Sequence, residues 1–178
     1  GGTAVRLTSD PAYEQLPVWS PDSKTIAFAS DRYGNFDIFT VRADAPGKWN
    51  RLTYNSASEL PEAFTPDGKS VLFSAAIQDP AESALFPTGR MTELYSVDLA
   101  GGKPRQILAT PVNSVSWAPD GKSFVYQDVK GFEDTWRKHH TSSVTRDIWR
   151  YTPSTGRHQQ LIANPGEDLS PVAVSYTH

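Results

Sequence analysis

Short hydrophobic runs alternate with turn-forming residues along this chain, and one such arrangement occurs three times. In each copy an aromatic residue (Trp19, Phe64 or Trp117) precedes a small residue, Pro and Asp, and an apolar run follows shortly after a Lys. Pro fixes φ for a tight turn, Asp tolerates the next position, and Gly accepts the positive φ that closes the turn. Each copy therefore predicts a hairpin between two β-strands. The turns are Pro21-Asp22-Ser23, Pro66-Asp67-Gly68 and Pro119-Asp120-Gly121.

Two further elements repeat behind each hairpin. The first combines an acid, an aliphatic residue and an aromatic residue, and its alternation is typical of a strand. The second follows a polar turn and predicts a fourth strand. Four strands in a period of roughly 45 to 53 residues are typical of β-propeller blades. The expected third strands are 37–41, 93–97 and 147–151, and the expected fourth strands are 51–53, 105–108 and 158–162.

The two ends of the chain carry isolated pieces of the same repeat. Val5–Thr8 copies the fourth element, and 170–175 resembles the start of a first element. The chain is therefore predicted to be an all-β partial β-propeller, with about three four-stranded antiparallel blades and a stray strand at each end. Such an open arc is expected to be unstable alone or to self-associate. The expected bounds are an outer strand at 1–8, blades at 15–54, 60–109 and 113–163, and the start of the next blade at 170–178.

Three details of the repeat lead to separate expectations. Trp19, Phe64 and Trp117 are expected to fill the space between blades, as large aromatic residues usually do. The recurring Asp of each turn is expected to accept backbone hydrogen bonds rather than to form a calcium loop, because no further acids follow at alternate positions. Ser23 stands where the other turns have Gly, so this turn is expected to relax or to differ in type.

Composition excludes several kinds of function. The chain of 178 residues contains no cysteine, which rules out disulfides, zinc–thiolate sites and a Cys nucleophile. The net charge is −3 and basic residues do not cluster, so nucleic acid is not expected as a partner. No apolar stretch is long enough to cross a membrane, so no membrane partner is expected either. The chain begins partway through a blade, so we expect its natural start to be missing and its compartment to be undetermined.

One polar cluster in the third repeat suggests catalysis at first sight. His139 and His140 stand close to Ser142 and Ser143. A Ser nucleophile needs an oriented imidazole and acid, but adjacent side chains of an extended segment point to opposite sides. The chain has no Gly-x-Ser-x-Gly elbow, and Asp134 is the nearest acid for a metal site. We interpret the cluster as a polar loop, and we expect no catalytic residue, no metal ligand, no cofactor and no hydrolase activity from this chain.

The same loop is rich in basic residues that could contact a ligand. Arg137, Lys138 and Arg146, together with His139 and His140, could attract an acidic group such as a peptide carboxylate. The alternative is a solvated loop, because surface charges commonly have no specific partner. These five residues are therefore the candidate contacts for a peptide or partner protein.

The signature 17–32, followed by 34–39, resembles the WD-like propeller repeats of the TolB family. Tricorn-type peptidases and prolyl-oligopeptidase relatives use the same repeats, and the resemblance covers nearly the whole chain. The segment 136–149 is similar to the amino-terminal propeller of tricorn-type peptidases, where an aromatic-basic stretch leads into an Asp-aliphatic-Trp strand. The long insertions at 76–92 and 129–146 fit that propeller better than a compact TolB blade.

In tricorn-type enzymes, propellers precede a PDZ-like module and a serine peptidase domain. The resemblance thus implies a non-catalytic propeller segment that acts as a scaffold or gate for peptide substrates of a parent peptidase. Two alternatives stay open, a TolB-like envelope propeller that binds a protein and the propeller of a prolyl-oligopeptidase relative. The implied partners are a peptide or protein ligand, the rest of the propeller and a peptidase domain. TolB-like and bacterial tricorn-like relatives imply the periplasm or envelope, whereas archaeal tricorn implies the cytoplasm.

Overall fold

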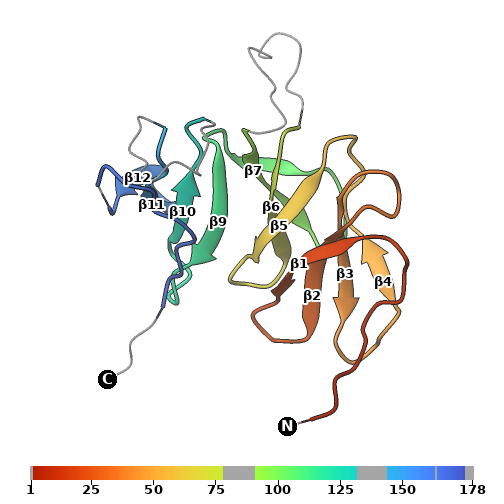
Figure 1. Ribbon diagram of the computed structural model, residues 1–178. Helices are drawn as coiled ribbons and strands as arrows, with labels where there is room; N and C mark the ends of the chain where they lie inside the picture. The colour runs from red at the N-terminus through yellow and green to blue at the C-terminus, as the bar shows by residue number, and fades with distance from the viewer. Residues whose placement is uncertain (1, 78–90, 132–143, 163, 175–178) are drawn as a thin grey trace.

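The computed structural model describes residues 2–77, 91–131, 144–162 and 164–174. These residues form 12 strands in three four-stranded antiparallel sheets, with no helix within those ranges. No helix that could cross a membrane occurs in this part of the chain. Each sheet takes its strands in chain order, as a propeller blade does. The predicted all-β fold with three blades is therefore confirmed, and Figure 1 shows the three sheets side by side.

The three sheets are named blades 1 to 3 along the chain. Blade 1 contains β1 (Glu14–Trp19), β2 (Thr25–Ser30), β3 (Asp37–Arg42) and β4 (Trp49–Arg51). Blade 2 contains β5 (Glu59–Phe64), β6 (Ser70–Ala75), β7 (Glu93–Asp98) and β8 (Arg105–Leu108). Blade 3 contains β9 (Val112–Trp117), β10 (Phe124–Asp128), β11 (Ile148–Thr152) and β12 (Arg157–Gln160).

The repeated acid of each third strand ties that strand to the outer strand of its own blade. Arg51 Nη2 lies 2.8 Å from Asp37 Oδ2 in blade 1. Gln106 donates to Glu93 at 2.6 Å in blade 2, and Gln160 donates to Asp147 at 3.0 Å in blade 3. The acid therefore has the same structural role in all three copies, which explains why the sequence repeats it.

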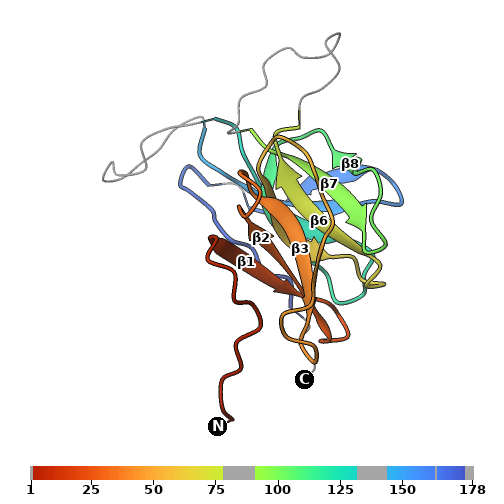
Figure 2. The ribbon, with the colours of Figure 1, turned by 90° about the vertical axis from the view of Figure 1, so that its right-hand side faces the viewer.

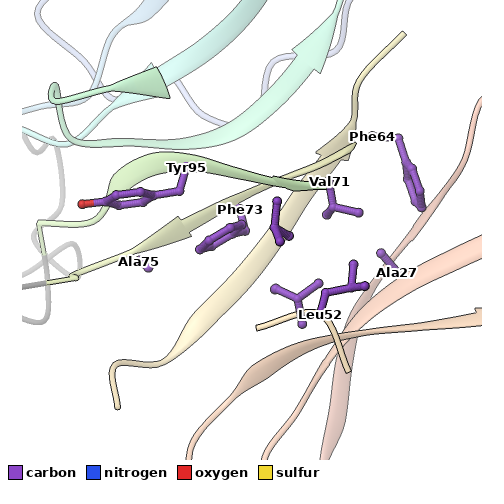
Figure 3. Packing of buried hydrophobic residues seen from close by; sticks show 9 residues of the cluster. Ala27, Leu52, Phe64, Val71, Phe73, Ala75 and Tyr95 are labelled. Carbon is purple, nitrogen blue, oxygen red and sulfur yellow. The ribbon is translucent and has the colours of Figure 1, made fainter. Parts of the chain in front are cut away.

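Hydrophobic residues pack mainly between neighbouring blades. In Figure 3, Phe64 and Val71 of blade 2 lie next to Ala27 and Leu52 of blade 1, and all four are buried. A second cluster joins blades 2 and 3; it contains Leu72 of blade 2 and Phe124 of blade 3, and Trp117 packs against it. Phe64 and Trp117 thus lie between blades as expected, but Trp19 does not. It is 55% exposed, because none of the described residues forms a blade in front of blade 1.

The stretch 168–174 occupies the place of a further inner strand. The inner strands β1 and β9 each contain a positive φ next to an irregularity in pairing, at Leu16 and Ser114. Ser170 has the same positive φ and, like Leu16, precedes a Pro. The Asp168 N–H donates to the Arg146 carbonyl at 3.0 Å. The equivalent bonds join Glu59 to Phe36 at 2.7 Å and Val112 to Thr92 at 3.0 Å.

The predicted stray strands at the two ends are wrong as secondary structure. Neither Val5–Thr8 nor 170–174 is a β-strand in the structure. A strand needs a ladder of hydrogen bonds to a neighbour, and the described residues offer each segment only isolated bonds. The segments nevertheless lie against the outer faces of blade 1 and blade 3.

The three Pro-Asp turns have one geometry. Each Asp Oδ1 accepts the N–H of the Lys two residues later, at 3.1, 3.1 and 3.0 Å in chain order, which confirms the expected role of this Asp. Ser23 has φ 57°, close to 69° at Gly68 and 66° at Gly121. The expectation of a different first turn is therefore wrong. The bond from the Ser23 N–H to the Ser20 carbonyl at 2.9 Å holds Ser23 in the left-handed region.

Ser23→Gly is expected to raise the free energy of unfolding by about 0.5 kcal/mol, because Gly adopts positive φ without steric cost. Gly121→Ala provides a control of opposite sign. An Ala at position 121 would have to keep a positive φ, and its Cβ would lie 3.0 Å from Pro66 Cβ. The free energy of unfolding is therefore expected to fall by about 1–2 kcal/mol. Urea unfolding of both variants measures these changes. A loss of stability in Ser23→Gly would contradict the premise that the positive φ of Ser23 costs free energy in the folded chain.

Candidate functional site

A polar hollow lies between blade 3 and the segment that follows it. Its volume is about 240 Å³, and it lies where β10 ends and β11 is about to begin. The hollow combines one guanidinium with amides, hydroxyls and a single exposed apolar side chain. Its lining residues are Asn113, Ser114, Gln127, Arg146, Leu169 and Ser170.

Local backbone geometry shapes two walls of the hollow. Ser114 has φ 54° at the irregular point of β9, and Ser170 has φ 53° at the equivalent point of the stretch 168–174, which is not a strand. Gln127 is 5% exposed, and its Oε1 accepts the Ser170 N–H at 3.0 Å. Further along the segment, the Ala173 N–H donates to Ser116 Oγ at 3.1 Å. The segment is thus bonded to β9 and β10, which fixes the wall that it contributes.

Arg146 supplies the charge of the hollow. Its backbone is held on both sides, because its N–H donates to Glu167 Oε2 at 3.2 Å and its carbonyl accepts from Asp168 at 3.0 Å. Its guanidinium, in contrast, has no hydrogen bond or ion pair to any residue that the structure describes. A half-buried cation on a fixed backbone is therefore available to a ligand in this hollow.

An ion network behind Arg146 holds this part of the chain in place. Lys130 Nζ donates to the Thr145 carbonyl at 2.9 Å, pairs closely with Asp147 and lies 3.6 Å from Asp128. Trp149 Nε1 donates to Asp128 at 3.0 Å. Burial lowers the pKa of Lys130, but the hydrogen bond to Asp147 and both carboxylates outweigh it, so the net shift is upward. Lys130 therefore stays charged and anchors the residues on either side of Arg146.

A second buried carboxylate lies at the neighbouring blade junction. Glu62 of β5 reaches across to β9, where its Oε2 accepts the Val115 N–H at 3.3 Å. Burial raises the pKa of Glu62, while hydrogen bonds from Ser74, Val115 and Ser114 oppose the shift. Glu62 thus supports the strand that carries Asn113 and Ser114, and it does not line the hollow.

The residues that line the hollow are suited to binding an anion. A guanidinium with nearby amide and hydroxyl groups is suited to a carboxylate. His158 is the one histidine within the described ranges. Its Nδ1 lies 2.8 Å from the hydroxyl of Tyr126 on blade 3. Burial raises the pKa of Tyr126 to about 12. No group of three His, Cys, Asp or Glu residues in this part of the chain could hold a metal.

The structure places one of the five candidate contacts predicted from the sequence. Arg146 lines the hollow, whereas Arg137, Lys138, His139 and His140 lie outside the described residues, as do Ser142 and Ser143. The sequence reasoning missed the other lining residues. Ser170 carried a usable signal, since Ser170-Pro171 repeats Leu16-Pro17, but nothing in the sequence singled out Asn113 or Gln127.

The comparisons with known proteins agree with this architecture. The family model of the tricorn protease N-terminal beta propeller domain matches residues 1–177. Dipeptidyl-peptidase 5 of Porphyromonas gingivalis is 28% identical over 154 residues, covering 80% of this chain and 20% of that protein. The chain thus spans only a minor part of this relative.

Two solved structures have the same fold at low sequence identity. A putative TolB from Agrobacterium tumefaciens has a TM-score of 0.61 at 21% identity, over 85% of this chain and 49% of that chain. Puromycin hydrolase has a TM-score of 0.60 at 17% identity, over 95% of this chain and 25% of that chain. At these identities the likeness concerns the fold.

Proposed function

The chain belongs to the family of tricorn protease N-terminal β-propeller domains, and on that premise we propose that it is the non-catalytic propeller segment of a tricorn-like peptidase. In this proposal it acts as a scaffold or gate for peptide substrates, and the peptidase domain belongs to the parent protein. The similarity to dipeptidyl-peptidase 5 supports a peptidase context. The further partners in this proposal are the rest of the propeller and that peptidase domain, in the periplasm or envelope.

One observation carries the choice of a peptide ligand. Arg146 lines a polar hollow, and its guanidinium has no partner among the residues that the structure describes. A peptide carboxylate offers two oxygens to a guanidinium, and Leu169 at the edge of the hollow can contact an apolar side chain. In this proposal Arg146 binds the carboxyl end of a peptide at the edge of the propeller.

Binding of a labelled Ala-Ala-Ala-Leu peptide with a free carboxyl end tests this assignment by fluorescence anisotropy. Arg146→Ala is expected to weaken binding about tenfold or more, because a charge-assisted hydrogen bond contributes about 1.5–3 kcal/mol. The same peptide with an amidated end is expected to bind the natural chain with a similar loss. Rising salt concentration is expected to weaken only the free-acid complex.

Arg157→Ala is the matched control, because it removes an exposed Arg from β12 of the same blade, away from the hollow. This variant is expected to bind like the natural chain. Equal binding of acid and amide, or unchanged binding by Arg146→Ala, would show that the hollow does not receive a carboxylate. If the peptide does not bind at all, the hollow has no role in peptide binding, and docking of a protein becomes the favoured function.

A further inference from the structure

A glutamate is fully buried at the junction of blades 1 and 2, which lie next to each other in Figure 2. Glu59 is the first residue of β5, and its N–H donates to the Phe36 carbonyl of blade 1 at 2.7 Å. Its Oε1 accepts a hydrogen bond from the Asn55 side chain. Its Oε2 has no hydrogen-bond partner among the residues that the structure describes. Since buried carboxylate oxygens normally have a donor, this oxygen requires an explanation.

The equivalent glutamate of blade 1 has the cation that Glu59 lacks. Glu14 is the first residue of β1 and pairs with the last residue of β2, as Glu59 pairs with the last residue of β6. Arg32, two residues after β2, donates to Glu14 Oε1 at 2.6 Å. Two residues after β6 the chain has Ile77, which packs against the apolar cluster of the junction. Blade 2 thus keeps the acid and has an apolar residue in place of its basic partner.

The charged groups around Glu59 do not compensate a negative charge on it. On the side of blade 1 lie Asp37 and Arg51, and Arg51 Nη2 is already 2.8 Å from Asp37 Oδ2. On the side of blade 2, β6 separates Glu59 from Glu93, which accepts the Tyr95 hydroxyl at 2.6 Å. An ionised Glu59 would therefore add a third carboxylate to a region with one guanidinium.

These surroundings favour the neutral form of Glu59. Burial raises the pKa of Glu59, hydrogen bonds from Thr53 and Asn55 oppose this shift, and the Asp37 carboxylate adds to it. The net shift of the pKa is upward. The closed junction is therefore most stable below the ordinary pKa of a Glu, about 4.3, and loses stability as the pH rises through the raised pKa.

The short linker 54–58 between β4 and β5 is the part of the junction that can admit water to Glu59. Asn35 ties this linker to blade 1, because its Nδ2 donates to the carbonyls of Asn55 at 3.0 Å and Ala57 at 2.9 Å. The Asn55 side chain ties the linker to Glu59 itself. The linker is otherwise at the surface, and its exposed residues are Tyr54, Ser56 and Ser58.

We propose that Glu59 is a pH-sensitive switch that controls the linker 54–58 at the junction of blades 1 and 2. While Oε2 carries a proton, the carboxyl group is neutral and the linker stays closed over it. As the pH rises, Oε2 releases its proton to water, and the ionised carboxylate is hydrated through an opened linker. The switch lies away from the Arg146 hollow of blade 3, so the inference goes beyond the peptide-binding proposal.

Two NMR measurements on the 178-residue chain test the switch from about pH 4 to pH 9. The carboxyl ¹³C signal of Glu59 is expected to titrate above the ordinary value of about 4.3. Hydrogen exchange of the Glu59 N–H, corrected for its intrinsic pH dependence, measures opening of the junction. Its protection is expected to fall about tenfold per pH unit between the ordinary and the raised pKa, because each opening then releases one proton.

Glu59→Gln keeps the shape of the protonated side chain but cannot ionise. The protection of the N–H at position 59 is therefore expected to become independent of pH in this variant. Glu14→Gln is the matched control, because it makes the same change at the equivalent position of blade 1. It is expected to leave the pH dependence at Glu59 unchanged.

Three results would overturn the inference. The first is a Glu59 signal that titrates at or below the ordinary value, which requires no variant. The second is protection of the Glu59 N–H that does not change with pH in the natural chain. The third is the same pH dependence in Glu59→Gln as in the natural chain. None of these measurements uses a peptide, so failure of the carboxylate test at Arg146 leaves them unaffected.

Discussion

Leu52→Ala is expected to lower the free energy of unfolding by about 3 kcal/mol. Leu52 is 2% exposed and packs between Ala27 and Ile38 of its own blade and Val71 and Phe73 of the next. Removing most of its side chain costs the transfer free energy of the lost atoms and leaves a cavity in a well-packed junction, and such changes cost about 2–5 kcal/mol. Urea denaturation followed by tryptophan fluorescence measures the change.

Leu7→Ala is the matched comparison, since Leu7 packs against Ile26, Phe28, Phe39 and Val41 on the face of blade 1 that is turned away from blade 2. Leu7 is only half-buried, so less apolar surface returns to water and the expected loss is about 1 kcal/mol. Equal losses in Leu7→Ala and Leu52→Ala would contradict the assigned difference between a covered and an uncovered blade face.

Arg51→Ala is expected to destabilise the fold by about 3–5 kcal/mol at neutral pH, the usual cost of removing one partner of a buried ion pair. Asp37 is fully buried, and Arg51 is the charged group that pairs with it. The Arg51 guanidinium also lies 4.5 Å from the ring centres of Tyr33 and Tyr54, and this packing disappears too. Denaturant unfolding at pH 7 measures the loss.

The pH dependence of this loss identifies its cause. Burial raises the pKa of Asp37, and Arg51 opposes that shift. Without Arg51 the pKa rises further, so the folded chain holds the proton of Asp37 more tightly than the unfolded chain does. The loss of stability caused by Arg51→Ala is therefore expected to be largest at neutral pH. It is expected to become smaller as the pH falls toward about 4, the ordinary range of an Asp.

Arg51→Ala combined with Asp37→Asn separates the charge from the packing. The double variant carries no buried charge at this position, so it is expected to recover part of the stability and to lose the extra pH dependence. An Arg51→Ala variant whose deficit is the same at pH 4 and pH 7 would show that lost contacts with Tyr33 and Tyr54 dominate.

The strands and the repeated acid could be predicted from the sequence because both depend on local patterns. An acid, an aliphatic residue and an aromatic residue recur at fixed positions, and in every blade the structure gives that acid a partner on the outer strand. The turn at Ser23 was predicted wrongly, since the sequence shows the steric cost of a Ser but not the hydrogen bonds that offset it.

The candidate site depended instead on contacts between distant parts of the chain. Gln127 meets Ser170, and Ser116 meets Ala173, only because the stretch after blade 3 lies along that blade. A single sequence gives no pattern for such pairs. Arg146 was identified because it belongs to a loop rich in basic residues that could attract an acidic group, yet its lack of a described partner became apparent only in the structure.

The hydrogen bonds between the stretch 168–174 and blade 3 have a consequence for where a propeller chain can be shortened or extended. The inner strands β5 and β9 belong to blades 2 and 3, but the first residue of each donates a backbone hydrogen bond to the blade before it, as Asp168 does to blade 3. The boundaries of a four-stranded sheet therefore differ from the boundaries of the unit that is held together by hydrogen bonds. Shortening the chain at the end of a four-stranded sheet therefore removes a hydrogen bond that the following inner strand donates to that sheet. An added repeat supplies this hydrogen bond through its own first strand.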